Sequence, residues 1–423
     1  MPNPPNILSN RGVRGVLGIA VILLFAWSLS ENRTRVPWRV VAVGVLLQFL
    51  LALLFLRFPP ARAAFLVLNR AVEALQNATE AGTGFVFGYL GGGQLPFAEM
   101  QPGASFIFAF RALPLVLVVS ALATLLFYWG VLQRIVQAFA WVLRRAIGVG
   151  GPLGLGAAVH IFVGHIEAPL LIRPYLTRLA RGELFALMSC GMAGIAGTVM
   201  VLYATLVGSV IPNALGNILI AAVISTPAAL AVAALMIPFR PDPSPTAELV
   251  IQDPPVSSMD AVAKGTRDGI VFLANIIAML VVTIALVSLV NAALGLLPDV
   301  AGALVTLQRL FAYAFRPIMW LIGIPAAEVA TAAALMGTKT VLNEFIAYVD
   351  LAHLPPDALS AQSRLIMMYA LCGFANFGSL GILIGGMGAM VPERRAEIVA
   401  LGLRSILSGT LATCMSGAVI GML

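Results

Sequence analysis

The chain has 423 residues, of which 60% are hydrophobic and 10% charged, and its mean hydropathy is +0.99. Soluble domains carry about 25% charged residues, so this composition excludes a water-soluble globular protein and indicates one embedded in a bilayer. The net charge of +7 comes from basic residues scattered beside apolar segments, not from the continuous basic stripe of a nucleic-acid-binding protein. We therefore expect lipid, and no nucleic acid, as a partner.

Eight segments are apolar over about the 20 residues that a membrane-spanning helix needs. They are 14–30, 38–57, 112–132, 184–209, 214–237, 269–295, 365–390 and 398–421. The first follows two arginines and precedes no small-residue cleavage site, so we interpret it as a retained helix, with a removed signal peptide as the alternative. Residues 61–77 carry Arg62, Arg70 and Glu73 among apolar positions, which is typical of a helix lying along the membrane interface.

Two further apolar segments, 153–180 and 316–352, are too long for one span and are interrupted by polar residues near the middle. The interrupting residues are His165 and Glu167 in the first segment and Asn343 and Glu344 in the second. Non-helical backbone at membrane depth is tolerated only where protein buries it or where it lines a wet cavity. We interpret both segments as re-entrant hairpins whose tips face one interior site.

These elements divide the chain into six parts. They are 1–110 (N-terminal helices and interfacial helix, scaffold), 111–150 (scaffold helix and connector), 151–240 (first repeat), 241–265 (proline-rich cytoplasmic linker), 266–300 (scaffold helix) and 301–423 (second repeat). If each hairpin returns to the side from which it enters, most of the 25 basic residues gather on one side, which is then cytoplasmic. This predicts a multi-pass protein of the inner membrane with both termini in the periplasm and with opposed hairpins.

The two repeats share a sequence pattern. The first contains Cys190-Gly-Met-Ala-Gly-Ile-Ala-Gly197 and the second Cys372-Gly-Phe-Ala-Asn-Phe-Gly-Ser379, each preceded by a lone glutamate in an apolar stretch. Transporters built from internal repeats bind substrate near the bilayer midplane, in helices broken by Gly or Pro. The pattern therefore predicts an inverted-repeat transporter. All three cysteines lie in apolar runs without metal-ligand spacing, so no disulfide, metal or cofactor is expected.

Glu167 and Glu344 are the lone glutamates of the two hairpins. A carboxylate at membrane depth costs about 2.5–3.5 kcal/mol and normally faces the bundle interior and a partner. Two structural glutamates bonded to backbone at helix breaks are the alternative. Because the two occupy equivalent places in both repeats, we favour a shared functional site.

Asn376 and Ser379 are three residues apart, which places both side chains on one helix face. Such residues suit a hydroxyl-rich solute, although hydrogen bonding between helices is a common alternative role. His160 and His165 lie near Glu167, and because imidazole titrates near neutral pH they are candidate proton carriers. Histidines bonded to backbone are the alternative, and a metal site lacks a further ligand at suitable spacing.

Six motifs follow one another in a fixed order from about residue 84. They are Gly84-Phe-Val-Phe-Gly88, Phe108-Ala-Phe-Arg-Ala-Leu-Pro114, Gly164-His-Ile-Glu-Ala-Pro-Leu-Leu-Ile-Arg-Pro-Tyr175, Glu183-Leu-Phe-Ala186, Lys339-Thr-Val-Leu-Asn-Glu-Phe-Ile-Ala-Tyr348 and Leu371-Cys-Gly-Phe-Ala-Asn376. In these motifs the chain resembles the concentrative nucleoside transporter family. The resemblance implies a homotrimer whose protomers are all-α, with eight transmembrane helices and two opposed re-entrant hairpins.

The resemblance also implies a substrate site. The positions that match the family's ribose ligands are Glu167, Glu344, Asn376 and Ser379, and those of an aromatic and an apolar neighbour are Phe374 and Val199. Where sodium-driven members commonly read Gln-Thr-Glu and bind the nucleobase, this chain reads His165-Ile166-Glu167. The sugar-binding half is therefore expected to be intact and the base preference to have changed.

The expected coupling ion departs from the family pattern as well. The family's side-chain ligands for sodium, an Asn and a Ser, match His160 and Gly194. Because Na⁺ prefers oxygen ligands, this predicts proton coupling through His160, His165 or Glu167, with sodium coupling as the alternative.

We thus expect a secondary active transporter that imports nucleosides by alternating access, and not an enzyme. One rival is an intramembrane nucleoside or glycoside hydrolase that uses Glu167 and Glu344 as acid and base. Another is a passive channel.

Overall fold

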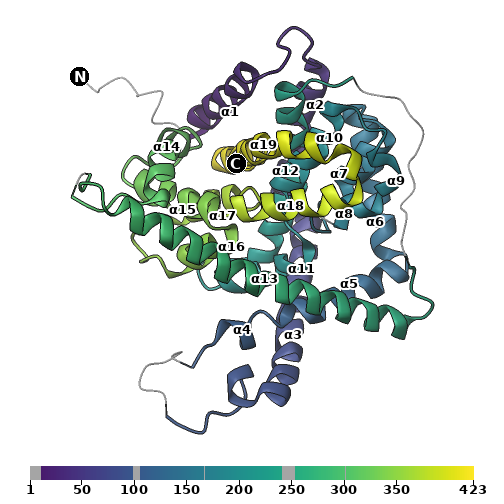
Figure 1. Ribbon diagram of the computed structural model, residues 1–423, viewed down its shortest axis with the longest axis vertical. Coiled ribbons are helices and arrows are strands. Elements are labelled where there is room, and N and C mark those ends of the chain that lie inside the picture. Colours follow the sequence, from purple (N-terminus) through teal and green to yellow (C-terminus); the bar gives the residue numbers. More distant parts are fainter. Residues whose placement is uncertain (1–10, 99–104, 166, 241–252, 301) are drawn as a thin grey trace.

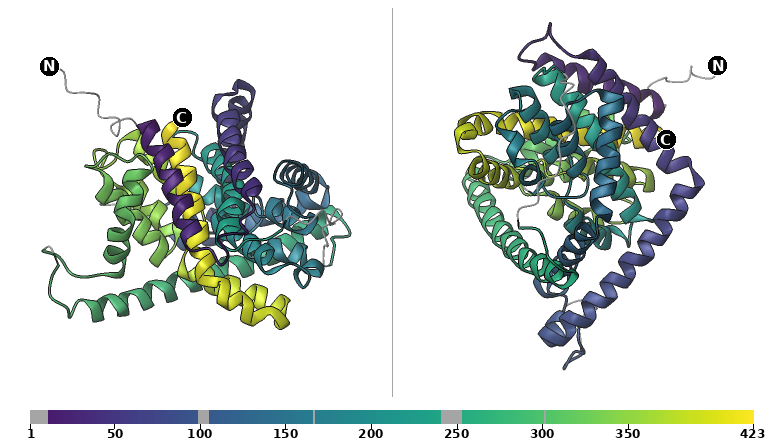
Figure 2. Two further views of the ribbon diagram at one scale, coloured as in Figure 1. Left: turned by 90° about the horizontal axis from the view of Figure 1, so that it is seen from above. Right: turned by 90° about the vertical axis from the view of Figure 1, so that its right-hand side faces the viewer.

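The computed structural model describes residues 11–98, 105–165, 167–240, 253–300 and 302–423. These ranges are mostly helical (Figure 1). The N-terminal part contains α1 (Arg11–Ser28), α2 (Trp38–Arg57), α3 (Pro59–Phe87), η2 (Gly88–Gly91), α4 (Phe108–Arg111), α5 (Leu115–Tyr128) and α6 (Val131–Ile147). The interfacial helix expected over 61–77 lies wholly inside α3, which continues to Phe87 and appears as a long separate helix in the right-hand view of Figure 2.

The first repeat contains a hairpin and a broken helix. Its elements are α7 (Gly151–Val159), α8 (Glu167–Leu171), α9 (Arg173–Leu176), α10 (Arg181–Ala193), α11 (Gly197–Val207) and α12 (Ala214–Met236). We call α7 and α8 hairpin 1. The segment 184–209, expected as one span, is two helices, because the backbone at Gly194 is extended (φ −99°, ψ 174°). Hydropathy does not register this break, since the residues on both sides of it are apolar.

The second repeat follows the same plan. Its elements are α14 (Leu307–Leu321), α15 (Val329–Val341), α16 (Glu344–His353), α17 (Ala361–Leu371), α18 (Phe377–Met390), η3 (Pro392–Arg394) and α19 (Arg395–Met422). We call α15 and α16 hairpin 2. The expected span 365–390 is likewise divided, between α17 and α18. In Figure 1 hairpin 2 lies to the left of α18 and hairpin 1 to its right.

Hairpin 2 begins later than the sequence predicted. Residues 316–321 belong to α14, and the following turn contains Gly323 with φ of +108°. Only glycine adopts such a backbone without strain, and Pro325 cannot continue a preceding helix. The expected hairpin start at residue 316 was therefore wrong, and Gly323-Ile-Pro325 was the signal that could have corrected it.

Two apolar helices have opposite surroundings. By length and composition, five helices in the described ranges could cross a membrane, and α12 and α13 (Ser258–Leu294) are among them. The apolar window of α12 is 94% buried, against α2, α10 and α19, whereas that of α13 is 0% buried. A helix that is apolar on all sides must meet protein or lipid, so α12 forms the centre of the fold. Helix α13 packs mainly against α5.

The start of α13 falls inside the range expected to be linker. Ser257 caps it by accepting a hydrogen bond from the backbone N–H of Asp260. Such a cap is a strong helix-start signal, and it places the end of the linker before Ser258 instead of at 265. Residues 241–252 of the expected linker lie outside the described ranges.

Both ends of the described chain lie on one side of the molecule. A Cβ added to Gly15 of α1 would come within 2.4 Å of Met422 at the end of α19, and the left-hand view of Figure 2 shows these helices side by side. In the loop after α1, Glu31 pairs with Arg181 (3.0 Å) and Arg404 (2.6 Å). The hydrogen bond from Arg181 is the main cause that lowers the pKa of Glu31 below its ordinary value. Glu31 thus joins two arginines that lie far apart in the sequence.

Candidate functional site

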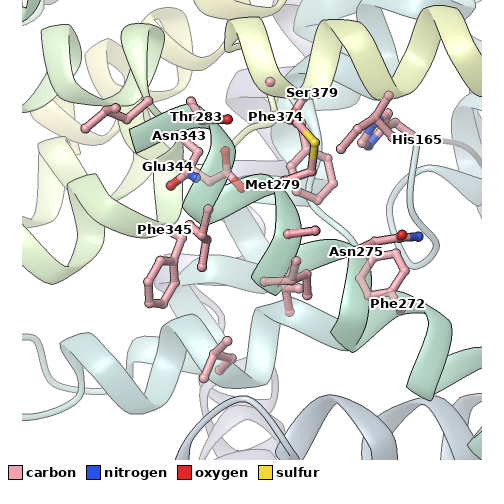
Figure 3. Close-up of a pocket in the computed structure, with 18 of the residues that line it drawn as sticks. His165, Phe272, Asn275, Met279, Thr283, Asn343, Glu344, Phe345, Phe374 and Ser379 are labelled. Atoms are coloured by element: carbon pink, nitrogen blue, oxygen red, sulfur yellow. The ribbon is translucent and has the colours of Figure 1, made fainter. Parts of the chain in front are cut away.

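The two hairpin tips meet at a cavity of about 580 Å³ (Figure 3). Its wall combines hairpin 1, hairpin 2, α11, the start of α18 and one face of α13. The expected site residues on this wall are His165, Glu167, Val199, Glu344, Phe374 and Ser379. Residues that lie far apart in the sequence therefore share one site. Ile166 lies outside the described ranges.

Each hairpin presents its glutamate at the same structural position. Glu167 is the first residue of α8, and Glu344 is the first residue of α16. The second arm of each hairpin contacts the broken helix of the other repeat, because α16 packs against α11 and α8 against α18. Because each hairpin packs against a helix of the other repeat, both carboxylates reach the same cavity.

Glu344 is held by two donors from different elements. Its Oε1 accepts a hydrogen bond from the hydroxyl of Tyr203 in α11, and its Oε2 accepts one from Nδ2 of Asn376, both at 2.7 Å. The glutamate is only 4% exposed. Hydrogen bonds to a charged group contribute about 1.5–3 kcal/mol, so these two compensate part of the cost of burying the carboxylate and fix its orientation.

Asn376 does not share a helix face with Ser379 as the spacing predicted. It is the N-cap of α18, and its Oδ1 accepts a hydrogen bond from the backbone N–H of Ser379 at 2.7 Å. The side-chain amide of Asn376 therefore has two functions. Its oxygen caps the start of α18, and its nitrogen donates a hydrogen bond to Glu344. Asn343 caps α16 in the same manner, so the sequence Asn-Glu places a helix start and a carboxylate at the tip of hairpin 2.

Glu167 lies close to the backbone of its own hairpin. A Cβ added to Gly164 would stand 2.2 Å from Oε2 of Glu167, a distance that no real contact allows. Glycine at position 164 thus leaves space for the carboxyl group. Glu167 also lines a second cavity of about 440 Å³ together with Lys264 and Asp268, and Asp268 lines both cavities. The two cavities therefore adjoin at Glu167 and Asp268.

The histidines occupy different places. His165 lies on the cavity wall, where its ring centroid is 4.8 Å from that of Phe374. His160 is buried behind the tip, and its Cε1 would lie 3.1 Å from a Cβ added to Gly191 in α10. Within the described residues, the Nε2 atoms of both rings are buried without a hydrogen-bond partner. Buried polar groups are rarely left in this state.

Sequence reasoning missed two contributions to the site. One is Tyr203, which holds Glu344. The other is a polar face of α13 with Asn275 and Thr283; in Figure 3 Thr283 lies beside Asn343 and Glu344, and Asn275 lies beside Phe272. Residues seven or eight apart lie on one helix face, so the spacing was visible in the sequence, but nothing in it indicates which face of an apolar helix meets a cavity.

Comparisons with known proteins agree with this architecture. Three family models match: "Na+ dependent nucleoside transporter N-terminus" over residues 17–90, "Nucleoside recognition" over 109–210 and "Na+ dependent nucleoside transporter C-terminus" over 217–421. An uncharacterized transporter of Haemophilus influenzae is 36% identical over 96% of both chains. Solute carrier family 28 member 3 of Homo sapiens is 34% identical, over 97% of this chain and 59% of its own length.

A solved structure is similar along nearly the whole chain. The transporter CNTnw, in an inward-facing substrate-bound state, gives a TM-score of 0.86 at 33% identity, over 97% of this chain and 98% of that one. This confirms the expected class of all-α polytopic membrane protein. The relatives and structural neighbours are transporters and not enzymes, so the hydrolase alternative is dropped. The chain belongs to the concentrative nucleoside transporter family.

Proposed function

We propose that this protein is an ion-coupled secondary active transporter that imports nucleosides across the inner membrane by alternating access. The observation that carries the proposal is the doubly bonded Glu344 on a cavity wall that Glu167 and Ser379 share. Two carboxylates accept hydrogen bonds and the serine hydroxyl can also donate one. This combination suits the vicinal hydroxyl groups of a ribose.

The nucleobase is assigned to the other part of the cavity. There the rings of Phe374 and His165 offer apolar faces, and Asn275 offers donors and an acceptor from α13. Aromatic side chains stack on any base because every base has a π-face, whereas an amide distinguishes hydrogen-bonding edges. Asn275 is thus the described polar group best suited to select among bases.

The transport movement is assigned to the hairpin-bearing part of the molecule. Helix α13 packs mainly against α5, while the hairpins pack against the broken helices of the opposite repeats. The first arms of the hairpins also pack against α6 and α14. The proposed moving unit therefore comprises both hairpins with α6, α10, α11, α14, α17 and α18, and α13 with α5 belongs to the scaffold. The six-part division of the chain, with the linker ending before Ser258, belongs to this proposal, as do the homotrimer and the periplasmic termini.

The proposed coupling ion is the proton. The support is the pair of buried imidazoles, His160 and His165, whose Nε2 atoms lack partners among the described residues. Gly194, beside the carbonyl of His160, carries no side-chain oxygen for a hard cation. The family models are described as sodium-dependent, which makes sodium the second candidate.

Purified protein in liposomes tests both parts of the proposal. We expect radiolabelled nucleoside to accumulate inside the vesicles under an inward pH gradient and not under a sodium gradient alone. Uptake that needs sodium and ignores pH would exclude proton coupling but leave nucleoside transport intact. Equilibration without accumulation would indicate a passive facilitator. The matched control is the double variant His160→Asn/Gly194→Ser, which restores side-chain oxygens and is expected to gain sodium dependence.

A further inference from the structure

A lysine is completely buried beside the site and has no role in the mechanism described so far. Lys339, in α15 of hairpin 2, is 0% exposed. Its Nζ donates hydrogen bonds to the backbone carbonyl of Ala370 at 2.8 Å and to Oγ1 of Thr413 at 3.1 Å. Neither partner is a carboxylate. Burying an ammonium group is costly unless it is paired, so its position here calls for a physical reason.

The carbonyl that Lys339 contacts belongs to the end of a half-helix. Ala370 is the second-to-last residue of α17, which ends at Leu371. The last four carbonyls of a helix have no partner within it, and together they form the negative end of the helix dipole. The ammonium of Lys339 is therefore a charged cap on the C-terminal end of α17, and Thr413 of α19 holds the ammonium from another side.

The same hairpin supplies the opposite charge to the other half of the broken helix. Helix α18 begins after Asn376, the N-cap, whose Nδ2 donates to Glu344 of α16. An N-terminal helix end is positive, so the carboxylate is placed near the end that it stabilises. Hairpin 2 thus holds α17 through Lys339 and α18 through Glu344, one charge from each of its arms. Hairpin 2 therefore stabilises both helix termini that flank the break, the end of α17 and the start of α18.

The broken helix of the first repeat has different groups beside its break. The end of α10 is approached by His160, whose carbonyl oxygen would lie 3.1 Å from a Cβ added to Gly194. The imidazole beside it lacks a partner at Nε2 within the described residues. The helix end in the second repeat therefore has a built-in cation, while that in the first lies beside a backbone carbonyl and a buried imidazole.

We propose that Lys339 is a positioning residue for the sugar. Its ammonium holds the end of α17, and this fixes the start of α18, where Asn376 bonds Glu344 and Ser379 lines the cavity. The inference rests on the proposed function of nucleoside transport. It assigns to Lys339 an effect on substrate affinity that reaches beyond the stability of the fold.

The test compares two buried cations. Lys339→Met keeps the length and the apolar stem of the side chain and removes its charge. Arg364→Met is the matched control, because this buried guanidinium donates hydrogen bonds to backbone carbonyls of α16 and of the connection before α17, and to no carboxylate among the described residues. We expect Lys339→Met to raise the KM for nucleoside uptake in liposomes about 10-fold. Arg364→Met should lower the unfolding temperature and leave KM within about twofold of wild type.

Two outcomes would overturn the inference: an unchanged KM in Lys339→Met, or an equal rise in Arg364→Met, which would mean that any lost buried cation loosens the site. If Lys339→Met does not insert into the membrane, the variant Thr413→Val tests the positioning role instead. This variant keeps the shape of Thr413 and removes one acceptor of the ammonium, and we expect a KM about 3-fold above wild type at an unchanged unfolding temperature. A KM equal to wild type would refute the positioning role.

A second readout separates charge from packing. In Lys339→Ala, externally added ethylammonium should restore part of the lost uptake, since it carries the missing cation into the space of the missing side chain, whereas ethanol should not. Rescue by both compounds, or by neither, would contradict the role of the charge. Wild-type protein that takes up no nucleoside would overturn the proposed function and this inference together. Wild-type uptake with an unaffected Lys339→Met would overturn the inference alone.

Discussion

The two hairpin tips differ in how completely their polar groups are bonded. At the tip of hairpin 2, both carboxylate oxygens of Glu344 accept hydrogen bonds and the helix behind it is capped by Asn343. In hairpin 1, His160 and His165 each bury an Nε2 atom that has no partner among the described residues. Buried polar atoms are normally satisfied, so Glu344 is fully bonded at the second tip, whereas the two imidazoles of hairpin 1 keep unused hydrogen-bonding capacity toward the described residues.

This difference suggests a division of work between the two repeats. A fully bonded tip keeps one geometry whatever the ionic conditions, which suits recognition of an invariant group such as a ribose. A tip with unsatisfied imidazoles changes its energy when a proton or a ligand arrives, since an unpaired buried polar group costs about 1–3 kcal/mol. The second repeat would then supply the rigid part of the sugar site through Glu344, and the first would add the response to the coupling ion through its histidines.

Exchanging each glutamate for glutamine tests this division most directly. Glu344→Gln puts an amide NH₂ against one of two donors, Tyr203 or Asn376, and removes the charge. We expect kcat/KM for nucleoside uptake to fall about 30- to 100-fold, which corresponds to about 2–3 kcal/mol, at every pH tested. Glu167→Gln should reduce it only about 10-fold and should weaken the response to an imposed pH gradient.

Membrane insertion is the control for both variants, measured as the amount of folded protein by fluorescence-detected gel filtration. Near-normal uptake by Glu344→Gln would remove the ribose contact from the mechanism. Equal losses in the two variants, with the same dependence on pH, would break the distinction between the tips.

A smaller effect is expected at the glycine that makes room for Glu167. Gly164→Ala introduces a Cβ at 2.2 Å from Oε2 of Glu167, so the carboxylate must move while its chemistry is unchanged. We expect kcat/KM to fall about 3- to 10-fold. The matched control is Gly385→Ala in α18, where an added Cβ meets nothing within 4 Å, and which should keep wild-type uptake. A Gly164→Ala variant with wild-type uptake would show that the position of Glu167 is not critical.

The sequence predicted the paired glutamates because the pattern around them is repeated and a carboxylate is rare in an apolar segment. It predicted most of the spans because hydropathy depends on composition alone. The breaks at Gly194 and between α17 and α18 were not visible in the hydropathy, since residues on both sides of each break are apolar. Tyr203 could not be assigned to Glu344 either, because that contact depends on how α11 packs against the other repeat.

Lys339 is a second residue whose contacts could not be predicted from the sequence. The sequence contains it within a motif, but nothing in its neighbours indicates that its ammonium reaches a carbonyl in α17 and a hydroxyl in α19. Contacts of this kind join elements that are far apart in the sequence. They decide which polar residues of an apolar chain form a site, and they follow only from the tertiary fold.

The smallest expected effect concerns the outer contact that joins the two repeats. Glu31 pairs with Arg181 at the start of α10 and with Arg404 in α19, so it links one helix from each repeat. Its pKa in the folded protein lies below the ordinary value, chiefly because of the hydrogen bond from Arg181. A lowered pKa means that the folded state favours the ionised carboxylate. The stabilisation is therefore fully present above the ordinary pKa and is lost as the pH falls through the lowered one.

Glu31→Gln should consequently lower the free energy of unfolding by about 0.5–1 kcal/mol at pH 7, the range of partly exposed ion pairs. The difference from wild type should shrink as the pH falls below about 4.3, the unperturbed value for glutamate. Unfolding temperatures of both proteins from pH 7 to 3.5 measure this, with Asp357→Asn in the loop before α17 as the control. A difference that stays constant across this range would mean that Glu31 acts through packing and not through its charge.

If Glu31→Gln also left nucleoside uptake unchanged, the coupling between the repeats would reside at the cavity, where α16 meets α11 and α8 meets α18.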